Sequence, residues 1–161
     1  RILDFGKSRE SFRKNYKLQE ILKDASLLVR LKLEQSQVSL TMNVNDAGIL
    51  VFVDKGQIQQ ALLNLILNAL GAMPKGGELK IDVKIVDQQR VEIFVRDTGS
   101  GIPTEFHSRI FDSFLTARTD GTGLGLTISK RILLGHDGDL ELVNSTEQGT
   151  EFKITLPISK S

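Results

Sequence analysis

The chain has 161 residues, 40% of them hydrophobic and 25% charged, which is the composition of one soluble globular domain. Its 21 basic and 20 acidic residues are interleaved and leave a formal net charge of +1, a distribution that argues against nucleic-acid binding. Disulfides and thiolate metal sites are excluded because cysteine is absent, and no apolar run approaches the roughly 20 residues that a membrane span needs.

The first half of the chain predicts two helices with two strands between them. Residues 18–35 repeat apolar side chains at the spacing of an amphipathic helix. Residues 38–44 and 49–54 alternate or run apolar around turn residues, as strands do. Residues 55–73 form the second predicted helix, which ends at Pro74 because proline cannot continue a helix.

The second half predicts more strands and one further long helix. Two strands of period two are joined by a short turn and should pair as an antiparallel hairpin, and two more strands close the chain. Helices and antiparallel strands in one small domain predict an α+β fold, a two-layer sandwich with helices on one face of a sheet. The predicted elements are strands at 78–86 and 90–97, a short helical piece at 104–111, a helix at 124–134, and strands at 139–145 and 150–157.

Two asparagines interrupt the otherwise apolar second helix. Asn64 and Asn68 are four residues apart and share a helical face with Gln57, Gln60 and Gly71. A buried amide without a partner costs about 1–3 kcal/mol, so either each amide bonds a nearby backbone group or this face meets a polar ligand. An amide oxygen is a neutral ligand that suits Mg²⁺, which would bring a phosphate-bearing molecule with it.

Two glycine-rich stretches follow. DTGSGIP, residues 97–103, comes directly after a strand, but the dinucleotide fingerprint G-x-G-x-x-G fails because position 104 is Thr104. DGTGLGL, residues 120–126, precedes a helix whose free N–H groups could bind an anion. The alternative for this second stretch is a flexible loop and a helix cap, and no P-loop motif is present.

Four motifs in one order, NLILNA, DTGSGIP, IFDSF and GTGLGLTISKRI, resemble the N, G1, F and G2 boxes of the catalytic ATP-binding domain of sensor histidine kinases. The resemblance covers about residues 18–157 and extends to the wider superfamily of gyrase, Hsp90 and MutL ATPases. It implies the Bergerat fold, a mixed, mostly antiparallel sheet covered by three helices. RILDFGKSRE resembles the end of the preceding dimerisation and phosphoacceptor helix, so we expect helix end and linker at 1–15 and the catalytic domain at 16–161.

The resemblance gives individual residues roles in binding ATP and Mg²⁺. It makes Asn68 the Mg²⁺ ligand and Asn64 a catalytic residue that helps polarise the transfer. Asp97 would read adenine, because a carboxylate accepts the exocyclic amino group and repels the carbonyl oxygen of guanine. The full expected set is Asn64, Asn68, Asp97, Gly99, Gly101, Ile102, Phe111, Phe114, Thr116, Arg118, Gly121, Thr122, Gly123, Leu124, Gly125 and Leu126.

Within this set, the resemblance implies that the glycines let the backbone come close to the nucleotide. Gly99 and Gly101 would let the backbone pass near the base, and the glycines of residues 121–125 would cradle the phosphates with Thr122 as an extra donor. Phe111 and Phe114 would anchor the ATP lid, with ordinary core packing as the alternative.

One charged lid residue departs from the commonest family pattern. NALGAM lacks the lysine that many members carry, which resembles the nitrogen-sensor-like subgroup with its lid lysine. Arg118 occupies that lid position and would act as a second catalytic residue at the terminal phosphate. Its alternative is a solvated surface arginine.

The implied function is transfer of the ATP γ-phosphoryl group to a histidine on an absent phosphoacceptor domain, and from there to a response regulator. His107 and His136 lack the phosphoacceptor motif and should be structural or surface residues. Asn64 replaces the general base of hydrolytic members, so ATP hydrolysis should be poor. We expect a cytoplasmic domain of a soluble or membrane-anchored sensor, monomeric in isolation and homodimeric at full length. The alternatives are a serine kinase of the anti-sigma type, an ATPase, and a nucleotide-binding regulatory module.

Overall fold

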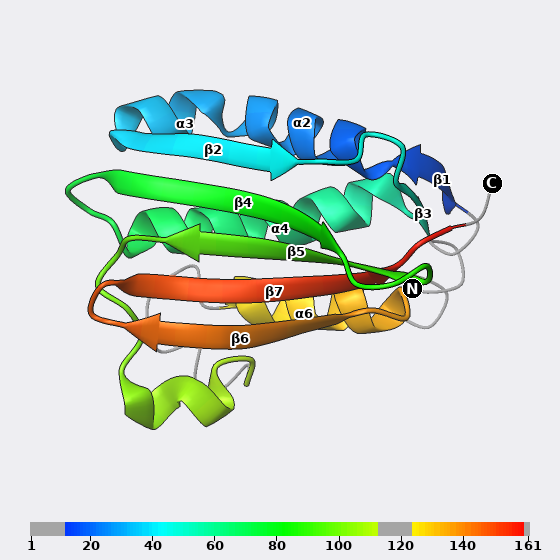
Figure 1. Cartoon of the computed structure of the whole chain (residues 1–161). Helices are drawn as coiled ribbons and strands as arrows, with labels where there is room; N and C mark the ends of the chain where they lie inside the picture. The colour runs from blue at the N-terminus through cyan, green and yellow to red at the C-terminus, as the bar shows by residue number, and fades with distance from the viewer. Residues whose placement is uncertain (1–11, 113–123, 160–161) are drawn as a thin grey trace.

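The computed structural model describes residues 12–112 and 124–159 (Figure 1). Within them, no helix is both long enough and apolar enough to span a membrane. The elements in chain order are β1 (Lys14–Lys17), α2 (Leu18–Leu28), α3 (Arg30–Gln35), β2 (Val38–Val44), β3 (Leu50–Val53), α4 (Lys55–Gly71), β4 (Gly77–Ile85), β5 (Arg90–Asp97), the 3₁₀ helix η1 (Thr104–Arg109), α6 (Leu124–Gly135), β6 (Asp139–Thr146) and β7 (Gly149–Pro157).

A five-stranded sheet of order β2-β4-β5-β7-β6 is the frame of the domain. β2 runs parallel to β4, and each of the other neighbouring pairs is antiparallel. The long helices lie behind this sheet in Figure 1 and leave its other face open. The predicted α+β sandwich with a mixed, mostly antiparallel sheet is therefore confirmed.

The helix expected over 18–35 is wrong in one respect, because it is broken into α2 and α3. Val29 leaves helical geometry at φ −106° and ψ 5°, and the chain resumes as a helix at Arg30. Both Val29 and Leu33 stay buried, at 5% and 6% exposure. The break thus keeps the apolar side chains of both segments in the core.

Strand β1 was missed from the sequence. It pairs antiparallel with β3 in a separate two-stranded sheet, with Asn15 opposite Phe52. Asn15 also accepts a hydrogen bond from the Ser159 hydroxyl at 2.5 Å. The strand includes Lys14 and Asn15, which the expected boundary places in the linker, and that boundary itself stays a prediction.

The core lies between the sheet and the helices, with α4 at its centre. Asp54 caps α4 by accepting a hydrogen bond from the Gln57 amide at 3.1 Å, as an N-cap aspartate does. The Ser129 hydroxyl of α6 donates to the Ala61 carbonyl oxygen of α4 at 3.1 Å, which fixes the two helices side by side. The buried residues of α4 are Ile58, Ala61, Leu62, Leu65, Ile66, Ala69 and Leu70.

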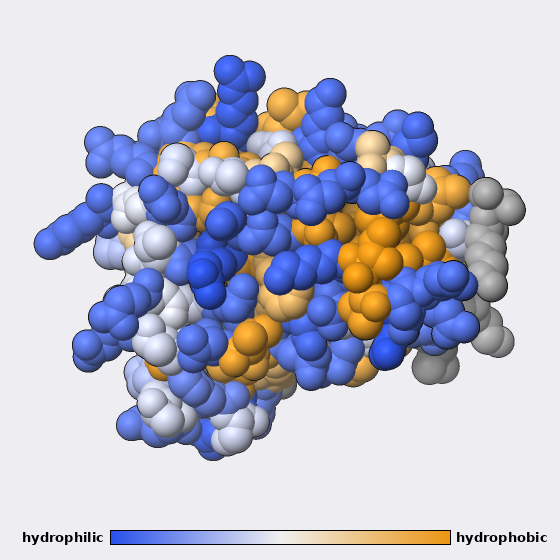
Figure 2. Space-filling view, in the orientation of Figure 1, coloured by the Kyte–Doolittle hydropathy of each residue, from blue (hydrophilic) through white to orange (hydrophobic). Residues whose placement is uncertain are grey.

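The open face of the sheet carries charged side chains. Lys153 lies between Glu92 at 3.4 Å and Glu141 at 3.2 Å, and Figure 2 shows hydrophilic residues over much of this face. Glu141 is exposed, whereas Lys153 and Glu92 are partly buried, so this face is a charged, partly solvated surface and not a second apolar core.

His136 joins the end of α6 to the start of α4. Its Nδ1 donates to the Ile132 carbonyl oxygen at 2.9 Å, and its Nε2 accepts from the Asp54 amide at 3.2 Å. The ring is 4% exposed, and this burial lowers its pKa. The ring is therefore neutral and structural, as the sequence analysis expects.

This arrangement makes stability depend on pH. Because the pKa of His136 is lower in the folded state than its usual 6.5, the unfolded chain binds the proton more readily. We expect the free energy of unfolding to fall as pH drops below about 6.5. Urea titrations of the wild type and of His136→Gln at several pH values measure this. Curves that stay parallel from neutral to acidic pH would rule out the assignment.

Candidate functional site

Asp97 is a carboxylate at a position that the strand pattern reserves for the core. It ends β5 two residues after buried Val95 and is itself only 4% exposed. Its Oδ1 accepts hydrogen bonds from the amides of Gly99 at 2.8 Å and Thr150 at 3.2 Å. Burial raises the pKa of Asp97, while these two bonds act in the opposite direction. A carboxylate kept where its ionised form is disfavoured is typical of a functional site.

The two oxygens of the Asp97 carboxylate differ in their contacts with the described residues. Within residues 12–112 and 124–159, both hydrogen bonds to this carboxylate end on Oδ1. Oδ2 can therefore accept a hydrogen bond from a molecule bound beside the loop.

The glycines after Asp97 are required by packing. A Cβ on Gly99 would lie 2.5 Å from the Ala72 carbonyl oxygen, just after α4. Gly101 has φ +86°, and a Cβ there would lie 2.0 Å from the Thr146 carbonyl oxygen at the end of β6. The loop therefore packs closely between the end of α4 and the β6–β7 turn. The expected approach of a base to these glycines stays a prediction.

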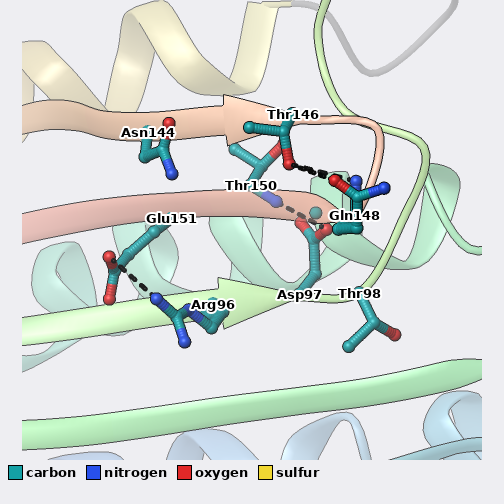
Figure 3. Close-up of a pocket in the computed structure, with 9 residues that line it drawn as sticks. Arg96, Asp97, Thr98, Asn144, Thr146, Gln148, Thr150 and Glu151 are labelled. Carbon is teal, nitrogen blue, oxygen red and sulfur yellow. Dashed lines mark hydrogen bonds and ion pairs between the residues drawn. The ribbon is translucent and has the colours of Figure 1, made fainter.

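Gly149 and Thr150 of the neighbouring strand, which were not expected as site residues, lie against Asp97, and the Thr150 amide bonds its carboxylate. The register of β5 and β7 places Arg96 opposite Glu151, so the next residue of β5 meets Thr150 (Figure 3). A Cβ on Gly149 would lie 2.0 Å from the Asp97 carbonyl oxygen. The sequence pattern predicts a strand from Thr150 and leaves Gly149 in the preceding link, and a glycine directly before this strand is the signal that could have indicated a close contact.

Asn64 lies on the face of α4 that meets the start of α6. Its Nδ2 donates to the Gly125 carbonyl oxygen at 3.3 Å, so the backbone-bond alternative holds for this side chain. A Cβ on Gly125 would lie 3.3 Å from the Asn64 Cβ, which makes Gly125 a packing residue between the helices. Gly125 also lies in the first turn of α6, where backbone N–H groups have no partner within the helix.

Asn68 follows one turn later on the same face. Its side chain is half-buried, and no residue of the described part of the chain hydrogen-bonds to it. The backbone carbonyl oxygen of Asn68 accepts a hydrogen bond from the Ala72 amide at 3.3 Å, and Ala72 contacts Gly99. The asparagine face and the Asp97 loop thus meet at the end of α4.

The Asp97 loop borders several hollows, and two of them lie against the ends of β5 and β6. One of about 320 Å³ lies over the end of β5, where Figure 3 shows the Arg96 and Glu151 side chains paired, 3.6 Å apart. The other, of about 670 Å³, is lined by residues 100–104 and 145–148. Neither is lined by Asn64 or Asn68, so neither is the place where a ligand would bridge the two parts of the candidate site.

Comparison with known proteins then decides the family. Residues 53–160 match the family described as histidine kinase-, DNA gyrase B- and HSP90-like ATPases. The chain belongs to this ATPase family. Membership implies that the domain binds ATP.

The relatives of this ATPase domain include proteins named as sporulation kinases and as sensor histidine kinases. Sporulation kinase C of Bacillus subtilis (strain 168) is 35% identical over 146 residues, which are 90% of this chain and 34% of that kinase. The nucleotide-free catalytic domain of histidine kinase ThkA matches with a TM-score of 0.81 and 29% identity, over 90% of this chain and 95% of that one. ThkA in complex with the response regulator protein TrrA matches with a TM-score of 0.76 and 26% identity, over 91% and 42% of the two chains. The chain spans about a third or less of the curated relatives it matches.

Phe111, which follows η1, contacts α6, so it connects the chain before residue 113 to the chain after residue 123. Its carbonyl oxygen accepts from the Thr127 hydroxyl at 3.0 Å, and the Lys130 ammonium lies 5.0 Å from its ring centroid. Its ring also packs against Phe152, with centroids 6.1 Å apart. The core-packing alternative therefore holds for Phe111, and its expected role in anchoring the lid stays a prediction.

The other expected site residues divide into two groups. Ile102 is half-buried and packs against the core, Leu126 is buried at 3% exposure, and Leu124 begins α6. The expected roles of the remaining residues fall outside the described residues and stay predictions. These residues are Phe114, Thr116, Arg118, Gly121, Thr122 and Gly123.

Proposed function

We propose that this domain binds ATP and transfers its γ-phosphoryl group to a histidine on a separate phosphoacceptor domain. The observation that carries the proposal is Asp97, a buried carboxylate whose Oδ2 is left to a ligand while its Oδ1 is held by two backbone amides. An acceptor in a desolvated pocket discriminates strongly between bases that offer a donor and those that offer an acceptor. Family membership and the kinase relatives support the same conclusion.

The asparagine face is proposed to hold Mg²⁺. Asn68 fits a hard cation because its amide is half-buried, neutral and without a hydrogen bond in the described residues. Bound Mg²⁺ would neutralise charge on the phosphate oxygens during transfer. Asn64 keeps its Oδ1 for the same region while its Nδ2 bonds Gly125.

Phosphoryl transfer then needs little from the protein beyond position and charge. A nitrogen of the acceptor imidazole bonds to phosphorus as the bond to the bridging oxygen breaks, and ADP leaves. Asn64 is a neutral amide that cannot take a proton from water, so hydrolysis is disfavoured relative to transfer. Arg118 is proposed to meet the terminal phosphate.

The proposed partners follow from the relatives. ThkA was solved with the response regulator protein TrrA, and we propose that a receiver domain of this kind accepts the phosphoryl group from the phosphorylated histidine. The domain is proposed to be the cytoplasmic domain of a soluble or membrane-anchored sensor. The full-length protein is proposed to be a homodimer, while the isolated domain is monomeric.

A transfer assay in trans tests the proposal. We expect this domain, mixed with radiolabelled ATP, Mg²⁺ and a dimerisation domain carrying the phosphoacceptor histidine, to label that histidine. The matched control is the same dimerisation domain with its histidine replaced by glutamine. Nucleotide binding without any labelling by cognate or related acceptors would favour a regulatory module, and acid-stable labelling of serine would favour a serine kinase.

A further inference from the structure

The backbone of Ile102 is held by two side chains, one at its amide and one at its carbonyl group. Its amide donates to the Ser145 hydroxyl at 2.8 Å, and its carbonyl oxygen lies 2.7 Å from His107 Nε2. A carbonyl oxygen only accepts, so His107 Nε2 donates this bond. One contact comes from β6 and the other from η1, two elements that are distant in sequence.

Ser145 also contacts β7, the strand whose Thr150 amide hydrogen-bonds to Asp97. Its hydroxyl lies 2.8 Å from the Thr150 hydroxyl, and Thr150 is 3% exposed. The Thr150 amide donates to Asp97 Oδ1 at 3.2 Å. One hydrogen-bonded series thus runs from the Asp97 carboxylate through Thr150 and Ser145 to the far end of the same loop, at Ile102.

A β-bulge puts Ser145 in this place. Leu142 pairs with Phe152 but Asn144 pairs with Glu151, so Val143 is an extra residue in β6. Regular pairing would bring Asn144 opposite Thr150, whereas the bulge brings Ser145 there. Bulges commonly redirect a side chain beside a functional site.

We propose that Ser145 and His107 are positioning residues that fix the loop from Asp97 to Ile102 for adenine binding. The proposal rests on the proposed function and assigns these residues no contact with the nucleotide. Gly101 lies inside the held segment with φ +86°, a conformation that a free loop visits among many others. Holding both the amide and the carbonyl group of Ile102 raises the fraction of molecules whose loop is ready to bind, and apparent affinity is proportional to that fraction.

The same contacts connect the base-binding loop to the rest of the site. η1 leads from His107 to Ile110, which is buried at 8% exposure, and then to Phe111. The Phe111 carbonyl oxygen accepts from Thr127 of α6, the helix that contacts Asn64. The loop also contacts the end of α4, because the Ser100 amide donates to the Ala72 carbonyl oxygen at 3.2 Å. Loosening the Ile102 backbone therefore acts on the loop first, and on the asparagine face only through the loop's contacts with Ala72 or with η1 and α6.

The test compares Ser145→Ala with Ser145→Thr and Thr146→Ala. Ser145→Ala should weaken binding of a non-hydrolysable ATP analogue about three- to tenfold by calorimetry, because it removes the acceptor of the Ile102 amide. Hydrogen exchange at the Ile102 amide should accelerate by a similar factor. In the transfer assay KM should rise while kcat stays unchanged, and Ser145→Thr should restore wild-type values by keeping the hydroxyl.

Thr146→Ala is the matched control for damage to the turn. Within residues 12–112 and 124–159, the Thr146 hydroxyl hydrogen-bonds only to Gln148, so its removal disturbs the same turn without touching Ile102. His107→Phe, which removes the other contact, should raise KM as Ser145→Ala does. Equal losses in Ser145→Ala and Thr146→Ala, or wild-type affinity in Ser145→Ala, would overturn the inference. A wild-type domain that binds no nucleotide would instead overturn the proposed function.

Discussion

Replacing Asp97 with asparagine is expected to abolish ATP binding while leaving the ligand-free domain at least as stable as the wild type. The amide keeps an oxygen that accepts from the Gly99 and Thr150 amides, so the loop is still held. Its NH₂ group, however, would face the exocyclic amino group of adenine, donor against donor. Losing that acceptor should weaken binding at least about a hundredfold.

The expected stability of the ligand-free variant follows from the direction in which the pKa of Asp97 is shifted. Burial raises the pKa of Asp97, so the folded state binds a proton more readily than the unfolded chain. The stability linked to this group is therefore present at low pH and is lost as pH rises through the raised pKa. At neutral pH the ionised carboxylate destabilises the ligand-free fold, and asparagine removes that charge.

Calorimetry measures the affinity of the variant for ATP, and thermal unfolding without ligand measures its stability. Asp87→Asn is the matched control, because Asp87 Oδ1 also accepts from two backbone amides, those of Gln89 and Arg90. Asp87 lies in the turn at the other end of the β4–β5 hairpin and should affect neither quantity much. Unchanged affinity in Asp97→Asn would remove the adenine role, and a large loss of stability would show that Asp97 is retained for folding.

The regular elements could be predicted because their side chains repeat with the period of the element. β5 alternates buried and open side chains up to Asp97, and α4 buries apolar residues at helical spacing. β1 could not be predicted in this way. KNYK has polar residues at three of its positions and is a strand only because β3 pairs with it.

The residues of the candidate site also differ in whether a local sequence pattern or a distant contact identifies them. Asn64, Asn68 and Asp97 were found because each breaks a local apolar pattern or precedes glycines. Thr150 and Ser145 were missed because their contacts depend on the register of β7 against β5 and on the bulge in β6. Neither the register nor the bulge is encoded in a short window of sequence.

The glycines illustrate a third limit. Gly99, Gly101 and Gly125 are expected to allow close approach of a ligand, whereas each also lies where a Cβ would meet the protein itself. A missing side chain indicates that something passes close by, but it does not say whether that is a ligand or a neighbouring strand or helix.

Asn68→Ala is expected to reduce phosphoryl transfer at least about a hundredfold and to weaken nucleotide binding only when Mg²⁺ is present. The physical reason is that Asn68 is proposed as the protein ligand of a cation whose other ligands are phosphate oxygens and water. Removing the amide should not affect the fold, because no described residue hydrogen-bonds to it. Binding of an ATP analogue is measured with Mg²⁺ and with EDTA, and transfer is followed in trans.

Gln60→Ala is the matched control, since Gln60 lies two turns earlier on the same face of α4 and is exposed. It should bind the analogue and transfer the phosphoryl group as the wild type does. Asn64→Ala serves as a contrast, because it breaks the 3.3 Å bond to the Gly125 carbonyl oxygen and should weaken binding with or without the metal. If Asn68→Ala loses affinity equally in Mg²⁺ and in EDTA, the side chain contacts the nucleotide or supports the helix, and the metal must be held elsewhere.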